Sequence, residues 1–177
     1  MRITGGTLGG LRIKVPRGEI RPAMDRMRES VFGILGDLSG LSFLDIFSGS
    51  GIIALEAASR GASYIEAVEM DPKKRRTLLE NAGLSPVRIH CRFMAAELYV
   101  ERARRSFDLV FMDPPFPYRY KWDLLKSIVE SSIIGSNSRI LVHRPREDPC
   151  PALPQGLVLD ESREYGRSIV DFFSFFS

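Results

Sequence analysis

The feature that most constrains the fold is a regular alternation, between residues 41 and 143, of short apolar runs and segments with helical spacing. The apolar runs have the length usual for buried strands, and apolar residues in the segments between them recur every three or four positions. Strands that alternate with helices predict a mostly parallel sheet covered by helices on both faces. The predicted strands are residues 41–47, 63–68, 87–91, 107–112 and 139–143, and the predicted helices are residues 52–60, 71–81, 95–104 and 122–131.

The segment before this alternation has a different pattern. Residues 2–4 and 11–15 predict an extended pair joined by glycine turns, and residues 25–38 predict an amphipathic helix. We therefore expect a short basic β arm over residues 1–20, followed by a single larger domain over residues 21–177.

The segment after the alternation predicts a β-hairpin. Four prolines between residues 145 and 156 exclude a helix there. Residues 157–163 and 168–176 have strand patterns on either side of Gly166. The phenylalanines of the second strand are expected in the core rather than as base-stacking platforms. They are Phe172, Phe173, Phe175 and Phe176.

The net charge of +3 is concentrated at the start of the chain. Residues 1–30 hold seven bases and three acids, a balance of +4, whereas the other 147 residues hold 18 bases and 19 acids, a balance of −1. Of the 25 bases, 20 are arginine, whose planar guanidinium suits phosphate contacts. The arm thus predicts a polyanionic partner, most simply a nucleic acid. The alternative is a basic surface that faces solvent and has no partner.

Other features favour an ordinary cytoplasmic protein. The first residues, Met-Arg-Ile-Thr-Gly-Gly, lack the apolar segment of a signal peptide. Apolar stretches are far shorter than the ~20 residues that cross a bilayer, so no membrane partner is expected. Cys91 and Cys150 are far apart without metal-site spacing, so we expect two free thiols and no metal.

A glycine-rich turn, Asp45-Ile46-Phe47-Ser48-Gly49-Ser50-Gly51, follows the first strand of the alternation. Glycines let backbone N–H groups and the start of the next helix approach a ligand closely. Glu69 follows the second strand, 18 residues after Gly51, where an acid can hold the hydroxyl pair of a ribose. The pattern predicts a nucleotide-like ligand and leaves NAD and S-adenosylmethionine open. A tight turn without a ligand is the alternative.

A second cluster, Asp113-Pro114-Pro115-Phe116, follows the fourth strand. The two prolines prevent a helix and leave their carbonyls without a neighbouring donor. The Asp113 carboxylate and the Pro114 carbonyl can accept both N–H bonds of an exocyclic amine while Phe116 stacks on its ring. This arrangement directs the nitrogen lone pair at an electrophile such as a sulfonium methyl. A proline-stiffened turn is the alternative.

The two clusters resemble those of N-methyltransferases that use S-adenosylmethionine to modify exocyclic amines of bases. Further segments resemble the RsmD family, which methylates N2 of a guanine in small-subunit (16S) ribosomal RNA, so the similarity spans nearly the whole chain. These segments are the first six residues, residues 21–32 (Arg-Pro-Ala-Met-Asp-Arg-Met-Arg-Glu-Ser-Val-Phe), residues 56–62 and residues 165–168.

The resemblance implies a Rossmann-like class I methyltransferase fold of the α/β class, with a mostly parallel seven-stranded sheet and an antiparallel C-terminal hairpin. It also implies S-adenosylmethionine as cofactor and 16S ribosomal RNA as partner. Because a small domain with a short arm gains specificity from proteins already on the RNA, we expect a monomer that acts on an assembling small subunit. The implied site residues are Asp45, Ser48, Gly49 and Gly51 at the methionine end of the cofactor, Glu69 at the ribose, and Asp113, Pro114 and Phe116 at the guanine.

Some positions depart from the family pattern, and others are expected to have structural roles. Ala23 replaces the usual threonine after Arg-Pro. Residues 93–96 offer no polar side chain to the cofactor adenine, so backbone groups would replace it, with Met94 packed on the adenine ring. His90 and His143 lie in predicted strands and are expected to be structural. The run from Tyr118 to Tyr120 either clamps flanking nucleotides or forms a surface loop.

Three other functions share some of these features. A DNA adenine-N6 methyltransferase would use the same Asp-Pro-Pro-Phe cluster, but 177 residues leave no separate domain for reading a duplex. An NAD-dependent oxidoreductase would use the glycine turn but not Asp113. A non-catalytic RNA-binding module has no reason to combine Asp113 with Glu69.

Overall fold

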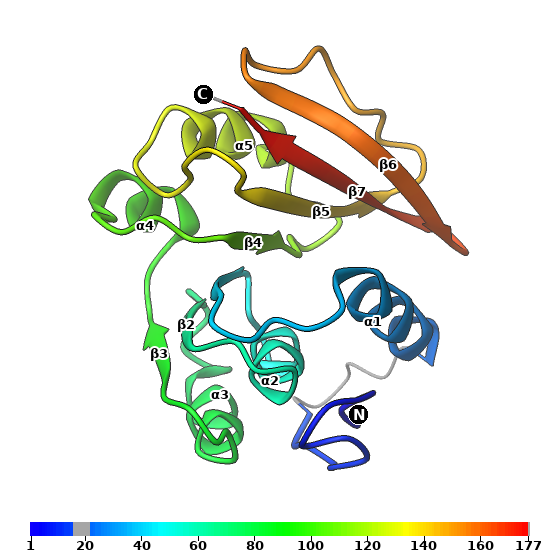
Figure 1. The fold of residues 1–177 in the computed structure, drawn as a ribbon, viewed down its shortest axis with the longest axis vertical. Coiled ribbons are helices and arrows are strands. Elements are labelled where there is room, and N and C mark those ends of the chain that lie inside the picture. Colours follow the sequence, from blue (N-terminus) through cyan, green and yellow to red (C-terminus); the bar gives the residue numbers. More distant parts are fainter. Residues whose placement is uncertain (16–21, 177) are drawn as a thin grey trace.

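The structure is a computed structural model that describes residues 1–15 and 22–176. Its centre is a seven-stranded sheet with the strand order β3-β2-β1-β4-β5-β7-β6 (Figure 1). Strands β1 to β5 are parallel, and β7 runs antiparallel to both of its neighbours. The strands are β1 (Ser42–Ile46), β2 (Tyr64–Val68), β3 (Ile89–Arg92), β4 (Leu109–Met112), β5 (Arg139–Pro145), β6 (Leu157–Tyr165) and β7 (Ser168–Phe175).

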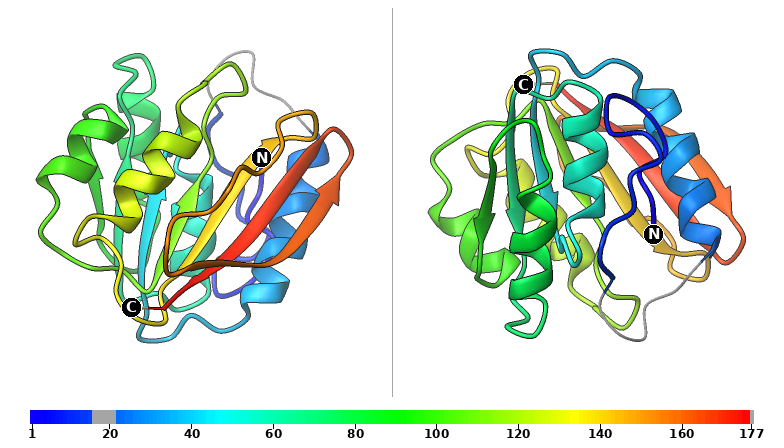
Figure 2. Two further views of the ribbon diagram at one scale, coloured as in Figure 1. Left: turned by 90° about the horizontal axis from the view of Figure 1, so that it is seen from above. Right: turned by 90° about the horizontal axis from the view of Figure 1, so that it is seen from below.

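Helices cover both faces of the sheet (Figure 2). Helices α1, α2 and α3 and the arm contribute to one core layer, which includes Phe32, Leu55 and Leu78. Helices α4 and α5 contribute to the other, which includes Tyr99 and Leu125. The helices are α1 (Pro22–Leu35), α2 (Ile52–Ser59), α3 (Arg75–Ala82), α4 (Ala96–Arg102) and α5 (Lys121–Val129). The structure confirms the predicted α/β fold, with a mostly parallel sheet and an antiparallel C-terminal hairpin.

Some element boundaries differ from the predicted ones because local hydrogen bonds decide them. α1 ends at Leu35, short of residue 38, because Gly36 adopts a left-handed φ of 72°. α3 begins at Arg75, not at Asp71, because residues 72–74 form a separate turn. In that turn the Lys73 N–H donates to Asp71 Oδ1 at 2.9 Å. Asp71 therefore caps the turn and not the helix.

The phenylalanines of the C-terminal hairpin lie in three environments. Phe172 and Phe173 are fully buried on opposite faces of β7, one in each core layer, as predicted. Phe175 is half-buried. Phe176 lies beyond the end of β7 and is 58% exposed, so its predicted place in the core is wrong.

The described part of the basic arm packs on the face of the sheet that carries α1, α2 and α3. Arg2 and Arg12 pair in an antiparallel bridge, which agrees with the predicted extended pair. Ile3 and Ile13 are buried in the same core layer as α1 and α2. The arm is therefore anchored to the body by apolar side chains on the face opposite its exposed bases.

A close backbone approach adds to this anchoring. A Cβ on Gly6 would lie 1.9 Å from the carbonyl oxygen of Ser59 at the end of α2, so only glycine fits there. Arg17, Arg21 and the expected division of the chain after residue 20 lie outside the described residues, as does the side chain of Ala23.

The parallel register brings three strand ends to one edge of the sheet. Ile46 at the end of β1 lies beside Val68 of β2 and Met112 of β4. The residues that follow these ends, among them Glu69 and Asp113, therefore meet at this edge, where ligands of open α/β sheets bind.

Two further expectations concern the thiols and the helices. Cys91 and Cys150 are both free, as predicted. Every helix in residues 1–15 and 22–176 is too short or too polar to cross a membrane.

Candidate active site

The turn between β1 and α2 has an unusual backbone conformation. Phe47, Gly49 and Gly51 have φ values of 67°, 57° and 83°, and the left-handed region is uncommon for a bulky residue such as Phe47. A Cβ on Gly51 would lie 2.7 Å from Cδ1 of the buried Leu78, whereas a Cβ on Gly49 would meet open space. Gly51 is favoured mainly by its left-handed φ, and Gly49 leaves the backbone open to a ligand.

Asp45 lies fully buried beneath this turn. Its Oδ2 accepts hydrogen bonds from the Ser48 hydroxyl at 2.6 Å and the Ala54 N–H at 3.2 Å. Its Oδ1 is buried without a hydrogen-bond partner among the described residues. Burial, with smaller contributions from the carboxylates of Asp113 and Glu69, raises the pKa of Asp45 to about 7. An unpaired buried acceptor near two other acids suits a cationic ligand.

Glu69 follows β2 and is 7% exposed. Its Oε2 accepts the Gly49 N–H and its Oε1 accepts the Asp71 N–H, both at 2.8 Å. These bonds tie the ends of β1 and β2 together and hold the carboxylate in one orientation. Each oxygen keeps a second lone pair, which a ribose hydroxyl can use.

Asp113 begins the Asp-Pro-Pro-Phe segment directly beside the glycine turn, because its N–H donates to the Ile46 carbonyl at 3.2 Å. The carbonyl of the buried Pro114 accepts no hydrogen bond from the described residues. The Pro115 carbonyl accepts the Tyr118 N–H at 2.8 Å. The prediction of a free carbonyl is therefore confirmed for Pro114 and wrong for Pro115, whose oxygen closes a turn.

His143 of β5 contacts Asp113, which the sequence analysis did not anticipate. Its Nδ1 lies 2.7 Å from Asp113 Oδ1, its side chain is 1% exposed, and Phe116 meets it edge-on with centroids 5.5 Å apart. An ionised carboxylate only accepts hydrogen bonds, so this contact requires the proton on Nδ1. The Nε2 atom is buried without a hydrogen-bond partner among the described residues.

An aromatic wall connects the turns after β1 and β4. The rings of Phe47 and Tyr118 lie 5.0 Å apart, and Tyr120, which is 64% exposed, lies 6.0 Å from Tyr118. The Tyr118 hydroxyl donates to Glu97 at the start of α4, and burial raises the pKa of that hydroxyl. Tyr118 is thus an ordered part of the site. Met94, half-buried, packs against the core layer of α4 and α5.

The site combines groups suited to two ligands. Three acids, Asp45, Glu69 and Asp113, meet around a glycine turn, and no group of His, Cys, Asp or Glu in the described ranges is arranged to hold a metal ion. The unpaired Oδ1 of Asp45 and the open backbone at Gly49 fit a positively charged nucleoside such as S-adenosylmethionine. Asp113 and the Pro114 carbonyl provide acceptors for an amine.

A sheet of this order, with a glycine-rich turn, Glu69 and the Asp-Pro-Pro-Phe segment at its strand ends, defines a methyltransferase that uses S-adenosylmethionine. Residues 1–174 match the family described as "Conserved hypothetical protein 95". The chain belongs to this family, which is the RsmD family that its sequence resembles.

Named proteins and a solved structure resemble the chain over nearly its whole length. It is 29% identical to "Putative rRNA methyltransferase YlbH" of Bacillus subtilis, with 94% of each chain covered. It is 28% identical to "Ribosomal RNA small subunit methyltransferase D" of Escherichia coli, with 94% of this chain and 86% of the relative covered. The structure of "Putative methyltransferase yhhF" from Escherichia coli superposes with a TM-score of 0.91 at 26% identity, covering 99% of this chain and 98% of the other.

Proposed function

We propose that the protein transfers a methyl group from S-adenosylmethionine to the N2 amine of a guanine in 16S ribosomal RNA. The observation that carries the proposal is the position of Asp113, beside the free Pro114 carbonyl and close enough to Asp45 for their carboxylates to interact. Two reactants, an aromatic amine and a cationic nucleoside, would meet at this edge. The ribosomal RNA methyltransferases among the relatives support RNA as the substrate.

In the proposed reaction a bond forms between guanine N2 and the methyl carbon, the carbon–sulfur bond breaks, and one N2 proton leaves. S-adenosylmethionine supplies the methyl group on a positively charged sulfur, which keeps the electron pair of the broken bond. Asp113 and the Pro114 carbonyl accept the two N–H bonds and turn the N2 lone pair toward the methyl group, while Phe116 stacks on the base. Asp113 is also the acceptor nearest to the departing proton.

The cofactor assignments follow from the strand ends. Asp45, Ser48 and the backbone of Gly49 and Gly51 would hold the methionine end, where the unpaired Asp45 Oδ1 can accept the amino group. Glu69 would accept the ribose hydroxyls. Met94 would pack on the adenine.

The bases of the arm would contact the RNA. Arg12 is exposed, whereas Lys14 pairs with Glu80 of α3 at 2.8 Å. A short arm with few free bases gives limited affinity by itself, so the proposed substrate is a small subunit in assembly, where bound proteins add contacts.

Labelled methyl transfer tests this function directly. Undermethylated small subunits, free 16S ribosomal RNA and DNA are each incubated with labelled S-adenosylmethionine, and the products are digested to nucleosides. We expect N2-methylguanosine from the RNA-containing substrates. Label in N6-methyladenine of DNA would instead support the adenine methyltransferase.

Asp113→Asn tests the assigned site. It removes a charged acceptor that acts in the transition state, so turnover should fall roughly a hundredfold or more. The affinity for S-adenosylmethionine, measured by calorimetry, should stay within a few-fold, since Asp113 faces the amine. Near-normal turnover would remove the assignment.

A further inference from the structure

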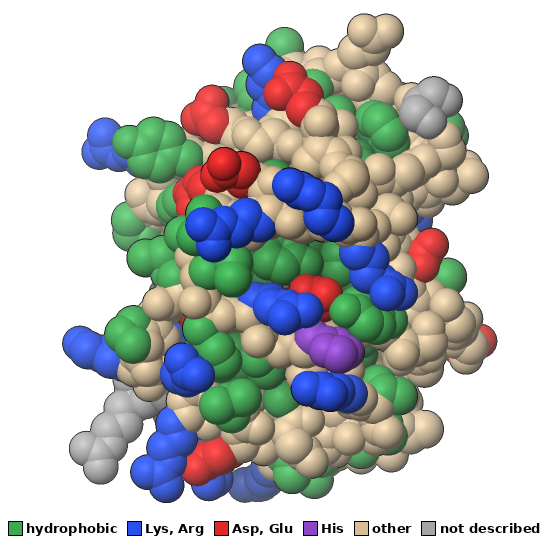
Figure 3. Space-filling view, turned by 90° about the vertical axis from the view of Figure 1, so that its left-hand side faces the viewer, with side chains coloured by type: hydrophobic (Ala, Val, Ile, Leu, Met, Phe, Trp, Pro, Cys, Tyr) green, Lys and Arg blue, Asp and Glu red, His purple; other side chains and the backbone are tan. Residues whose placement is uncertain are grey.

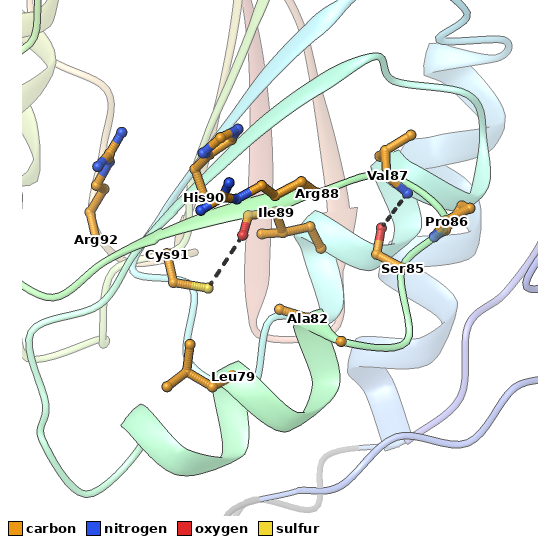
Figure 4. Close-up of a pocket in the computed structure, with 11 residues that line it drawn as sticks. Leu79, Ala82, Ser85, Pro86, Val87, Arg88, Ile89, His90, Cys91 and Arg92 are labelled. Atoms are coloured by element: carbon orange, nitrogen blue, oxygen red, sulfur yellow. Dashed lines mark hydrogen bonds between the residues drawn. The ribbon is translucent and has the colours of Figure 1, made fainter.

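Three arginines surround two stacked rings at the β3 edge of the sheet. Tyr64 of β2 and His90 of β3 stack with centroids 4.7 Å apart, and the Arg105 guanidinium lies 3.6 Å from the Tyr64 centroid. Arg92 follows His90 by two positions in β3, on the same side of the strand, and Arg88 directly precedes β3. Figure 4 shows His90 and Arg92 on one side of β3 and Cys91 on the other. We call these five residues, Arg88, Arg92, Arg105, Tyr64 and His90, the β3 patch.

Glu66, on the same face of β2, is already occupied by other groups. Arg92 Nε donates to it at 2.9 Å, and the hydroxyls of Tyr64 and Tyr99 donate to it at 2.7 Å and 3.0 Å. It therefore neutralises one arginine and positions the Tyr64 ring, and it leaves the other two arginines of the patch uncompensated.

Arg88 and Arg105 are exposed, and neither has an ion-pair partner in the described part of the chain. Burial and the positive charges of Arg88, Arg92 and Arg105 lower the pKa of His90, and the nearby Glu66 carboxylate opposes them in part. Figure 3 shows a face of the molecule on which Lys and Arg side chains gather around a histidine and hydrophobic groups. The β3 patch is thus positively charged and aromatic.

One end of the patch, at Arg92, adjoins the candidate active site. The Arg92 carbonyl accepts the Glu69 N–H at 3.0 Å, so the patch begins beside the proposed ribose acid. β3 is three strands from β4, so at about 4.8 Å per strand Arg92 lies on the order of 14 Å from the end of β4 that precedes Asp113. Arg88 and Arg105 lie farther from this edge, because they precede the amino ends of β3 and β4. The arm packs on the opposite face of the sheet.

We propose that the β3 patch binds the RNA next to the target nucleotide, with Arg88 and Arg105 on its phosphates. Stacking on Tyr64 fixes the plane of Arg105 and leaves its N–H edge for phosphate oxygens. An RNA that contacts both the arm and the patch would straddle the active-site edge. Exposed arginines beside two half-buried aromatic rings favour a nucleic acid over an acidic protein. The inference rests on the proposed function, because it assigns part of the substrate to this surface.

The test compares the double variant Arg88→Gln/Arg105→Gln with a control, Lys126→Gln/Arg163→Gln. Both remove two exposed positive charges, but Lys126 on α5 and Arg163 on β6 lie off the β3 edge. Filter binding to 16S ribosomal RNA is measured over a salt series. The patch variant should bind tenfold or more weakly in 0.1 M salt, with a slope of log affinity against log salt that is shallower by about 1.4 to 1.8. The control should stay near wild type.

Further measurements distinguish failure of the patch proposal from failure of the proposed function. S-adenosylmethionine affinity and the turnover number at saturating RNA should be unchanged in the patch variant, while KM for RNA rises. Unchanged RNA binding, or equal weakening in both variants, would overturn the proposal. If wild type binds polyglutamate as tightly as RNA and the patch variant loses that binding, the patch would instead be assigned to an acidic protein. If wild type binds RNA through the patch but never methylates it, the proposed function is wrong and RNA binding by the patch is still supported.

Discussion

At the scale of single residues, the site depends on side chains whose partners come from other strands. His143 touches Asp113 on one oxygen and leaves the other free for an amine. The His143 side chain, on β5, is buried, and its ring packs edge-on against Phe116. We interpret His143 as a positioning residue that orients the Asp113 carboxylate.

Substitutions of His143 distinguish positioning from a structural role. His143→Leu removes the N–H donor, so the turnover number should fall by about ten- to a hundredfold with little change in KM, because small misplacements of a reacting group are costly. His143→Asn can place an N–H near the former Nδ1 and should recover most of the rate. Rates are measured with both variants checked by urea unfolding. Equal impairment of two equally stable variants would contradict the interpretation.

Asp45 predicts a pH dependence of stability in the absence of cofactor. Its folded pKa of about 7 lies above the usual value of about 3.9, so the folded state binds the proton more tightly than the unfolded state. Its contribution to the unfolding free energy therefore falls as pH rises from about 4 to about 7, by up to roughly 4 kcal/mol, and is constant above that range.

Asp45→Asn should flatten this dependence. The unfolding free energy is measured in urea between pH 4 and pH 8, and the difference between wild type and variant isolates the Asp45 contribution. The exposed acid in Asp123→Asn serves as the control and should leave the curve unchanged. A variant curve parallel to that of wild type would show that Asp45 titrates normally.

At the scale of elements, one buried carboxylate connects the arm to two helices. Glu56 of α2 is fully buried and accepts bonds from the Thr4 N–H at 2.9 Å and from Arg28 of α1 at 3.3 Å, and it also pairs with Arg60. Arg28 is itself fully buried and donates to the Arg2 carbonyl at 3.1 Å. The arm, α1 and α2 thus form one hydrogen-bonded unit.

Glu56→Ala should destabilise this unit strongly. It leaves the buried Arg28 without its buried acidic partner, so the unfolding free energy should fall by about 3 to 5 kcal/mol. Glu80→Ala is the matched control, because Glu80 also links the arm to a helix but through the exposed Lys14, and it should cost at most about 1 kcal/mol. Urea unfolding and trypsin cleavage of the arm report both effects. Similar losses in the two variants would contradict the role of burial.

At the scale of the whole molecule, the sheet separates two basic surfaces and places the candidate site between them. The arm lies on the face of α1, α2 and α3, and the β3 patch lies on the side of the sheet that carries α4. The modest net charge of +3 does not reveal this distribution. Of the two surfaces, the sequence analysis predicted only the arm, because its bases lie in one short segment of the chain.

Most of the secondary structure, and the residues of the candidate site that follow the strands, can be predicted from the sequence. Periodicity is a local property, so the alternation of strands and helices was visible in the order of apolar residues. The glycine turn, Glu69 and the Asp-Pro-Pro-Phe segment each directly follow a predicted strand, and parallel strands bring their carboxyl ends to one edge. That rule was enough to bring Asp45, Glu69 and Asp113 together.

Contacts between side chains that are distant in the sequence depend on the order and register of the strands in the folded sheet. His143 reaches Asp113, 30 residues away, because β5 lies beside β4 with Val142 opposite Met112. Arg105 reaches Tyr64 because the loop after α4 returns to β2. Local patterns report the period of each element but not which strands become neighbours or in what register, and those depend on packing across the whole sheet.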